Sequence, residues 1–328
     1  MEHRPLGRTD LRVSDLGFGC GMVGGLLTRG EYPVMRRAVS RAIEAGINYF
    51  DTAPLYGDGQ SEVNLGAILR ELRADVVVGT KVRLAPSDLD RISAAIPASL
   101  EASLRRLGRD SVDLYQLHNP ITARRRPDQV SLTPDDVSVV LRAFEALQRQ
   151  GKIRFWGITA LGETEALHQV VAAGGLHTIQ TVYNLLNPSG GRPVEPGFPY
   201  QDYRRLIDLA AAQQIGVIAI RVLAGGALSG TTDRHPIAMR GVAPISTGRD
   251  YAEDAARARQ FDFLVTERVA ESLVEAAIRF AISHPGISTA MVGTSSLEQL
   301  DHAVAAANRG PLPAEALGRV YTALSRTT

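Results

Sequence analysis

The sequence predicts an α/β protein folded as a closed (β/α)8 barrel, and three observations support this fold class. Short apolar runs alternate in strict order with longer helical patterns along the 328 residues, which is typical of a parallel sheet surrounded by helices. Eight such runs can be counted, as in a TIM barrel. Polar side chains suited to chemistry follow several runs at their carboxyl ends, where barrel enzymes carry their functional groups. We therefore expect one barrel domain over residues 1–328.

A small β-hairpin is expected before the barrel. Residues 4–6 and 11–13 flank the polar turn 7–10, a pattern typical of two short strands joined by a tight connection. Trp156 lies on one of the barrel strands and is expected in the core. The apolar runs predict these strands over residues 16–18, 48–50, 76–79, 114–117, 155–158, 178–182, 217–222 and 290–292.

Helices are predicted between the strands, with start or stop signals at their ends. Gly46 and Gly108 stand where two of them should end, since glycine accepts the left-handed conformation that closes many helices. The predicted helices cover residues 34–45, 61–70, 89–107, 134–150, 163–173, 201–214, 265–283, 297–308 and 314–324.

Three connections are longer than ordinary ones, namely 119–133, 187–200 and 224–261. Each follows a predicted strand, so we expect them at the carboxyl-terminal face of the barrel, lining a pocket or forming a lid. Plain surface insertion is the alternative. An open doubly wound sheet is a weaker alternative fold, because the glycine-rich segment 17–21 lacks the helix start and the downstream acid of a dinucleotide fingerprint.

Bulk composition excludes several function classes. The net charge of +1 and the pI near 8.0 create no strong field for nucleic acid or a membrane surface, and the basic run 124–126 is interpreted as a solvated loop. Cys20, the single cysteine, cannot form an internal disulfide, and the histidines lack metal-ligand spacing, so no metal is expected. No apolar stretch has membrane-spanning length, and the first residues lack a signal-peptide pattern. A cytoplasmic location is expected.

Four polar residues stand at the ends of three successive strands. Asp51 and Tyr56 follow the run 48–50, Lys81 ends the next run, and His118 ends the third. If these strands are parallel neighbours, the four side chains converge. Lys81 is one of only two lysines among 36 basic residues, and unlike arginine a lysine can have its pKa tuned. The alternative is a purely structural ion pair between Lys81 and Asp51.

These residue types fit proton transfer to an oxygen. A phenol ionises near about pH 10, so a catalytic Tyr56 needs a neighbour that stabilises the phenolate, and the ammonium of Lys81 can do so. Asp51 would hold Lys81 charged, and His118 could donate a hydrogen bond to a substrate oxygen. Hydride addition to a carbonyl matches this set, with the hydride brought by a nicotinamide cofactor.

The chain resembles the aldo-keto reductases over nearly its whole length. The resemblance lies in the hairpin, in Gly17-Phe18-Gly19, in the motif from Asp51 to Gly57, in Lys81 after Gly79-Thr80, and in the run from Asp113 to His118. It implies a (β/α)8 barrel that uses NADPH or, less often, NADH to reduce an aldehyde or ketone. Tyr56 would be the proton donor, Lys81 and Asp51 would tune it, and His118 would orient the carbonyl.

The resemblance also implies a cofactor site along the strand ends. The nicotinamide amide would lie near Thr159 and Gln180, and the pyrophosphate would lie over a glycine-containing loop. The phosphate end would meet the start of the helix predicted at 297. The full implied cofactor set is Gly19, Cys20, Gly21, Asp51, Thr159, Gln180, Tyr183, Asn184, Arg221, Leu223, Gly226, Gly293, Thr294, Ser295 and Gln299, and the implied substrate pocket is Met22, Tyr56, His118 and Asn119.

Several positions depart from the family pattern. Ala160 replaces an asparagine common at the nicotinamide amide, and Ile220 with Arg221 stands where relatives stack an aromatic ring. Gly293 and Gln299 occupy positions where a lysine or arginine usually grips the 2′-phosphate of NADP. NADPH is still expected, because backbone amides and hydroxyls near Ser295 can hold a phosphate, and NADH is possible.

Other functions remain open from the sequence. The same site could run backwards as an NAD(P)+-dependent sugar or alcohol dehydrogenase. A Schiff-base lyase with Lys81 as nucleophile and a cofactor-binding regulatory subunit with little turnover are alternatives of other classes. The expected partner is a small-molecule carbonyl compound or sugar, and neither its identity, the direction of reaction nor the oligomeric state can be inferred from fold-level similarity.

Overall fold

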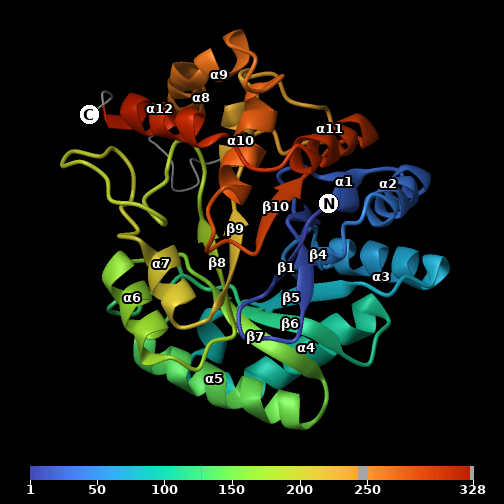
Figure 1. Ribbon diagram of the computed structural model, residues 1–328. Helices are drawn as coiled ribbons and strands as arrows, with labels where there is room; N and C mark the ends of the chain where they lie inside the picture. The colour runs from blue at the N-terminus through green and yellow to red at the C-terminus, as the bar shows by residue number, and fades with distance from the viewer. Residues whose placement is uncertain (127, 243–249, 326–328) are drawn as a thin grey trace.

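The computed structural model describes residues 1–126, 128–242 and 250–325. Within them, eight parallel strands close into a barrel in the order β10-β3-β4-β5-β6-β7-β8-β9, with the helices outside (Figure 1). The barrel strands are β3 (Leu16–Gly19), β4 (Tyr49–Asp51), β5 (Val77–Val82), β6 (Val112–Leu117), β7 (Ile153–Thr159), β8 (Thr178–Val182), β9 (Gly216–Ile220) and β10 (Thr289–Gly293). The predicted fold class is confirmed.

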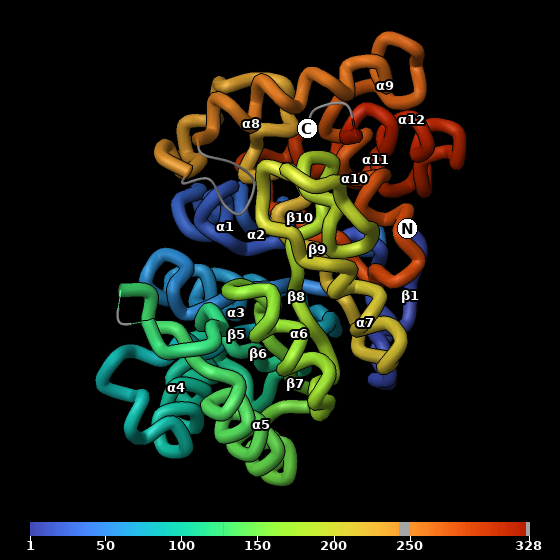
Figure 2. Tube along the Cα trace, turned by 90° about the vertical axis from the view of Figure 1, so that its left-hand side faces the viewer, coloured from blue at the N-terminus to red at the C-terminus, as the bar shows by residue number. Residues whose placement is uncertain are grey.

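The helical layer surrounds this barrel. Its α-helices are α1 (Leu26–Arg29), α2 (Tyr32–Glu44), α3 (Gln60–Leu72), α4 (Ile92–Leu107), α5 (Pro134–Arg149), α6 (Thr164–Ala173), α7 (Leu206–Ala212), α8 (Tyr251–Ala258), α9 (Phe263–Thr266), α10 (Leu273–Ile282), α11 (Leu297–Asn308) and α12 (Ala314–Ser325), with short 3-10 turns η1 (Pro86–Asp88), η2 (Ala224–Ser229) and η3 (Arg259–Phe261). Helices α2 and α11 come from opposite ends of the chain and pack together, with α11 above α2 in Figure 1. Figure 2 shows the same chain trace turned by 90° about the vertical axis.

Local sequence accounts for many of these boundaries. In α5, the Thr133 side chain caps the helix by accepting a hydrogen bond from the Asp136 amide, and the Asp136 carboxylate accepts one from the Thr133 amide. Pro134 occupies the first turn, where its missing N–H is not needed. On the barrel side, every residue of β6 is buried, as expected of a parallel strand covered on both faces. The result is a continuous core between strands and helices.

The predicted hairpin is present and closes the amino-terminal end of the barrel. Strands β1 (His3–Pro5) and β2 (Arg12–Ser14) pair antiparallel. Leu6, Leu11 and Val13 are buried against side chains from inside the barrel. Gly7 has φ 58°, and a Cβ there would lie 2.2 Å from the Gly216 amide nitrogen, so only glycine lets the hairpin turn approach the strand so closely.

Two predicted helices were wrong in extent. The helix expected over 201–214 is formed only as α7, because Arg204 and Arg205 have positive φ angles of 46° and 59°. The helix expected over 265–283 is split into α9 and α10 by the residues around Arg268, whose φ is 61°. Ser272 then caps α10 by accepting a hydrogen bond from the Glu275 amide. Non-glycine residues rarely adopt this backbone conformation, so it is hard to anticipate.

Other boundaries differ more modestly. The helix expected from residue 89 begins at Ile92, after η1, and the connection 224–261 contains η2, α8 and η3. Helix α1 was not predicted. Residue 127 of the first long connection and residues 243–249 of the third lie outside the described residues. None of the described helices has the length and apolar character needed to cross a bilayer.

A half-buried histidine makes the stability of the barrel depend on pH. His177 packs edge-on against the rings of Phe155 and Trp156, with centroids 5.2 and 4.2 Å away. Burial, and secondly the charge of Arg8, lowers the pKa of His177 from 6.5 to about 4. The neutral ring therefore favours the folded state above pH 6.5, and this contribution is lost as the pH falls toward about 4. We expect His177→Gln to flatten that part of the curve of unfolding free energy against pH, measured by urea unfolding. Parallel curves for variant and parent would contradict this.

Candidate active site

Asp51, Lys81 and Tyr56 form one contact group at the carboxyl end of the barrel. Asp51 ends β4, and Lys81 lies near the end of the neighbouring strand β5. The Lys81 ammonium donates to Asp51 Oδ2, to the Thr52 carbonyl at 2.9 Å and to the Tyr56 hydroxyl at 3.5 Å. Lys81 is completely buried and Asp51 is 6% exposed. The expected convergence of these three side chains is present.

Tyr56 reaches this group from the turn that follows β4. Its amide donates to the Ala53 carbonyl at 3.1 Å, and Gly57 and Gly59 have φ angles of 61° and 88°, conformations that glycine adopts without strain. The His118 ring, just beyond β6, meets the Tyr56 ring edge-on with centroids 6.0 Å apart. All four predicted catalytic side chains thus lie together, although their roles stay predictions.

The Asp51 carboxylate is held on both oxygens. Oδ2 faces Lys81, while Oδ1 accepts hydrogen bonds from the Tyr49 hydroxyl at 3.0 Å and from Gln180 Nε2 at 2.8 Å. Gln180, expected beside the nicotinamide amide, therefore contacts the catalytic group directly. A buried carboxylate with this many donors keeps its orientation, so it fixes the position of the Lys81 ammonium.

The electrostatics agree with a charged Lys81 and a neutral phenol. Burial alone lowers the pKa of Lys81, but Asp51 and Tyr56 raise it more, and the net pKa is above the ordinary value. Burial around the hydroxyl raises the pKa of Tyr56, and Lys81 opposes this by lowering it. The phenol was expected to be acidified, but burial outweighs Lys81 here. Tyr56 consequently carries its proton at neutral pH and has it available to donate.

His118 is neutral in this environment. Burial first, and then the positive charges of Lys81, Arg83 and Arg221, lower its pKa well below the ordinary value. Its Nδ1 is buried and makes no hydrogen bond to the described residues. A neutral imidazole can donate one hydrogen bond to a substrate oxygen, which is the chemistry inferred for His118 from the sequence.

The first loop of the barrel borders this group. Gly21 lies against the Tyr56 ring, because a Cβ there would be 3.7 Å from Tyr56 Cζ. Gly19 ends β3 beside Gly293 of β10, and the Met22 carbonyl accepts from Arg29 at 2.6 Å. Burial raises the pKa of the Cys20 thiol strongly, which agrees with Cys20 as a small packing residue without redox duty.

The implied nicotinamide and pocket residues are not all at the strand ends. Thr159 is next to Gln180 in the β7–β8 pairing, and its hydroxyl donates to the Leu117 carbonyl at 2.8 Å. The Tyr183 ring is instead buried in the helical layer, stacked on Phe280 with centroids 5.0 Å apart. Asn119 is also buried, and its amide group bonds Leu84 and the Val130 carbonyl. The structure therefore does not bring Tyr183 to the catalytic group of Asp51, Lys81 and Tyr56.

The loop after β9 contains the glycine turn expected under a pyrophosphate. Asn184 Nδ2 donates to the Arg221 carbonyl at 3.0 Å, and the Leu223 carbonyl accepts from the Gly226 amide at 2.8 Å. Gly225 and Gly226 follow with φ angles of 69° and 108°. The two glycines have no side chains of their own, and Arg234 and Tyr251 lie over Gly226, where a Cβ would be 3.1 Å from Arg234 Nη1 and from the Tyr251 hydroxyl.

Arg234 is a candidate anion ligand that the sequence reasoning missed. Its Nη1 donates to the Gly225 carbonyl at 2.9 Å, and its guanidinium lies 5.1 Å from the centre of the Tyr251 ring. Its Nε is buried and has no hydrogen-bond partner among the described residues. Nothing in the local sequence around Arg234 distinguishes it from the other loop arginines, because the contact with Gly225 is made only when the chain folds.

The start of α11 forms a second candidate phosphate region. Ser296 caps the helix by accepting from the Gln299 amide at 3.2 Å, and Gln299 Oε1 accepts from the Ser295 amide at 2.7 Å. The Ser295 hydroxyl donates to the Gly24 carbonyl at 2.6 Å. Thr294 Oγ1 is buried without a partner among the described residues, so its hydroxyl is available to a phosphate at this helix terminus. Gly293 is exposed beside it.

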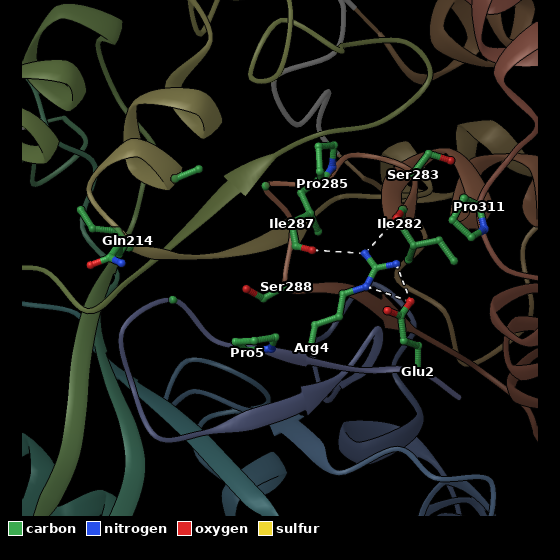
Figure 3. A pocket seen from close by; sticks show the side chains of 14 residues that line it. Glu2, Arg4, Pro5, Gln214, Ile282, Ser283, Pro285, Ile287, Ser288 and Pro311 are labelled. Atoms are coloured by element: carbon green, nitrogen blue, oxygen red, sulfur yellow. Dashed lines mark hydrogen bonds and ion pairs between the residues drawn. The ribbon is translucent and has the colours of Figure 1, made fainter.

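The opposite end of the barrel carries a groove of a different kind. An open groove of about 660 Å³ lies between the hairpin and the loops before β9 and β10, at the opposite end of the barrel (Figure 3). Arg4 in this groove is already bonded to Glu2 and to the carbonyls of Ile282 and Ile287. Within the described residues, no group of three or more histidine, cysteine, aspartate or glutamate side chains could hold a metal ion.

Comparisons with known proteins converge on one family. The family model described as "Aldo/keto reductase family" matches residues 15–324. The uncharacterized oxidoreductase YqkF of Bacillus subtilis is 28% identical over 324 residues, covering 96% of this chain and 94% of that protein. The L-galactose dehydrogenase of Arabidopsis thaliana is 28% identical over 311 residues, covering 93% and 88%.

A relative named as a channel subunit and a solved structure also match. A putative voltage-gated potassium channel subunit beta of Schizosaccharomyces pombe is 29% identical over 318 residues, covering 90% of this chain and 85% of that protein. The holo form of an aldo-keto reductase from Bacillus halodurans superposes with a TM-score of 0.73 at 27% identity, covering 100% of this chain and 97% of the other.

Proposed function

We propose, from the premise that the chain belongs to the aldo/keto reductase family, that this oxidoreductase reduces an aldehyde or ketone to an alcohol with a nicotinamide cofactor as hydride source. The observation that carries the proposal is the position of the Lys81 ammonium, between the Asp51 carboxylate and the Tyr56 hydroxyl. His118 lies beside the same phenol. This arrangement can protonate a developing alkoxide without a metal or a protein nucleophile.

Each side chain has a defined part in this proposal. When bound, the reduced nicotinamide supplies the hydride. The neutral His118 donates a hydrogen bond that orients and polarises the carbonyl oxygen. Tyr56 transfers its proton to that oxygen as negative charge develops, and Lys81 stabilises the resulting phenolate. Asp51 keeps Lys81 protonated and in place through the buried ion pair.

The cofactor proposed is NADPH, with NADH as the alternative. The unpartnered Thr294 hydroxyl and Arg234 Nε are polar atoms suited to phosphate oxygens, and the glycine backbone after β9 would approach the pyrophosphate. Positions 293 and 299 carry glycine and glutamine in place of lysine or arginine. The preference for NADPH over NADH is therefore the least constrained part of the proposal. Turnover with the two cofactors at equal concentration decides it, and a strong NADH preference would overturn the choice of NADPH.

A screen of carbonyl compounds tests the function itself. Aldehydes, ketones, aldoses and quinones are offered with each reduced cofactor, and loss of the reduced-nicotinamide absorbance is followed. We expect turnover with at least one aldehyde or ketone. The similarity to an L-galactose dehydrogenase supports a second candidate, oxidation of a sugar or alcohol with Tyr56 as base, which assays with oxidised cofactor would reveal.

Two further alternatives are weighed by the same measurements. The similarity to channel beta subunits supports a cofactor-binding protein with little turnover, which predicts tight cofactor binding and no reduction of any carbonyl compound tried. A Schiff-base lyase is disfavoured, because Lys81 is paired with Asp51 and its pKa is raised, whereas an amine nucleophile must lose its proton. The proposal includes a small-molecule substrate and a reducing cytoplasmic location, as the single cysteine suggests.

Replacing Arg234 should weaken cofactor binding without changing the catalytic side chains. We expect Arg234→Met to raise the dissociation constant for NADPH by about tenfold, since a hydrogen bond to a charged partner contributes about 1.5–3 kcal/mol. Nicotinamide fluorescence titration measures this without turnover. Arg105→Met, an exposed position on α4, is the matched control and should leave the constant unchanged. Equal constants for both variants would exclude Arg234 from the phosphate site.

A further inference from the structure

Arg83 is fixed beside the catalytic group by its backbone. It follows Lys81 by two residues and lies just beyond the end of β5 at Val82, and in extended chain this spacing puts two side chains on the same side. The Val82 carbonyl accepts from the His118 amide at 2.7 Å, and the Leu84 amide donates to Asn119 Oδ1 at 2.8 Å. Arg83 is therefore held between two anchored residues, next to His118 and above Lys81 at the mouth of the barrel.

Arg83 has no carboxylate partner among the described residues. Its side chain is exposed, and one long hydrogen bond joins its Nη2 to the Gln129 carbonyl at 3.3 Å. The arginines of the adjoining loop differ, because Arg125 is paired with Asp136 and Arg126 with Glu163. Most of the five guanidinium donors of Arg83 consequently remain available to a ligand.

The charge of Arg83 acts on the catalytic group itself. Lys81 is neutralised by Asp51, and His118 is neutral. Arg83, and Arg221 from β9 on the opposite side of the barrel, both lower the pKa of His118 after burial and Lys81. An exposed arginine without a carboxylate partner attracts anionic ligands, and the planar fork of arginine matches a carboxylate bidentately.

We propose that Arg83 is a specificity-determining residue that binds a carboxylate on the substrate, so that the preferred carbonyl compounds are anionic. The inference rests on the proposed reduction of a carbonyl group and adds its substrate class. The carbonyl oxygen lies with Tyr56 and His118, while a carboxylate elsewhere on the same molecule lies with Arg83. The substrate is then an oxo acid whose two functional groups are separated by a short spacer, such as a formyl-substituted benzoate.

A matched pair of aldehydes tests the proposal. 4-Carboxybenzaldehyde and 4-nitrobenzaldehyde have similar shapes, and only the first is anionic. For Arg83→Gln we expect KM for 4-carboxybenzaldehyde to rise by about tenfold with kcat little changed, while the constants for 4-nitrobenzaldehyde stay the same. Comparing the ratio of the two substrates between parent and variant removes their difference in intrinsic reactivity. Arg124→Gln, another exposed arginine of the adjoining loop, is the control and should leave the ratio unchanged.

Binding without turnover provides an independent measurement. Calorimetric titration with terephthalate, which carries carboxylates and no carbonyl to reduce, should give a weaker dissociation constant for Arg83→Gln than for the parent or Arg124→Gln. An unchanged substrate ratio together with unchanged terephthalate binding would overturn the role of Arg83. If no aldehyde or ketone of the screen is reduced but terephthalate binding still depends on Arg83, the proposed reaction fails and the anion site stands.

Discussion

Tyr56→Phe is expected to abolish carbonyl reduction while cofactor binding is retained. The variant keeps the ring that packs edge-on against His118 and loses only the hydroxyl that accepts from Lys81. Because the hydroxyl is the proposed proton donor, kcat should fall by about a hundred- to ten-thousand-fold, the usual contribution of general acid catalysis. Steady-state kinetics on any substrate found in the screen measures this loss, and nicotinamide fluorescence titration measures binding.

A second tyrosine serves as the control for this substitution. Tyr32 on α2 donates to Glu71 at the protein surface, so Tyr32→Phe removes a hydroxyl from the same residue type far from the catalytic group. We expect its kinetics to match those of the parent. If Tyr56→Phe reduced carbonyl compounds as fast as Tyr32→Phe, Tyr56 would have no part in the mechanism, and a water molecule or His118 would have to supply the proton.

The barrel could be predicted because its strands carry their own signals. Each is a short apolar run bounded by polar residues or glycine, and eight of them alternating with helices leave few other folds. Even so, β5 continues to Val82, beyond the apolar run that predicted it. Lys81 interrupts the apolar pattern but stays in the strand, because Asp51 and Tyr56 provide polar partners inside the barrel.

The helices at the carboxyl-terminal face were harder to predict. Helix α8 does have a local signal, since Asp250 caps it by accepting from the Glu253 amide, and an aspartate three residues before a glutamate is typical of a helix start. The break between α9 and α10 has no comparable signal. Arg268 adopts a left-handed conformation there, and tertiary packing of the flanking segments decides this rather than the preference of arginine.

The same distinction holds for the site: residues with a signal in the local sequence could be predicted, and residues placed only by the folding of a loop could not. The four proposed catalytic residues could be located because each follows an apolar run and parallel strands bring such ends together. Arg234 and the burial of Tyr183 could not, because both depend on where a loop lies after folding. The raised pKa of Tyr56 is a further example, since the sequence suggests the neighbouring charge but gives no measure of how strongly the hydroxyl is buried.

Lys81→Met is expected to damage both activity and stability. The substitution preserves length and apolar volume but leaves the Asp51 carboxylate buried without its ammonium, with only Tyr49 and Gln180 still donating to it. Removing one member of a buried ion pair costs about 3–5 kcal/mol, which urea unfolding can measure. Lys152→Met is the matched control, because the other lysine of the chain is paired with Glu101 at the surface, where such pairs contribute about 0–1 kcal/mol.

The pH dependence of the residual activity of Lys81→Met shows whether Lys81 changes the pKa of Tyr56, apart from its effect on stability. In the parent, Lys81 lowers the pKa of Tyr56 against the effect of burial, so its loss should raise that pKa further. Reduction requires the protonated phenol, and its decline at high pH should therefore move to still higher pH in Lys81→Met. A profile that overlays the parent's would mean that the ammonium does not tune Tyr56. Adding Asp51→Asn to Lys81→Met should restore much of the unfolding free energy but not the turnover, since it removes the unpaired charge without replacing the ammonium.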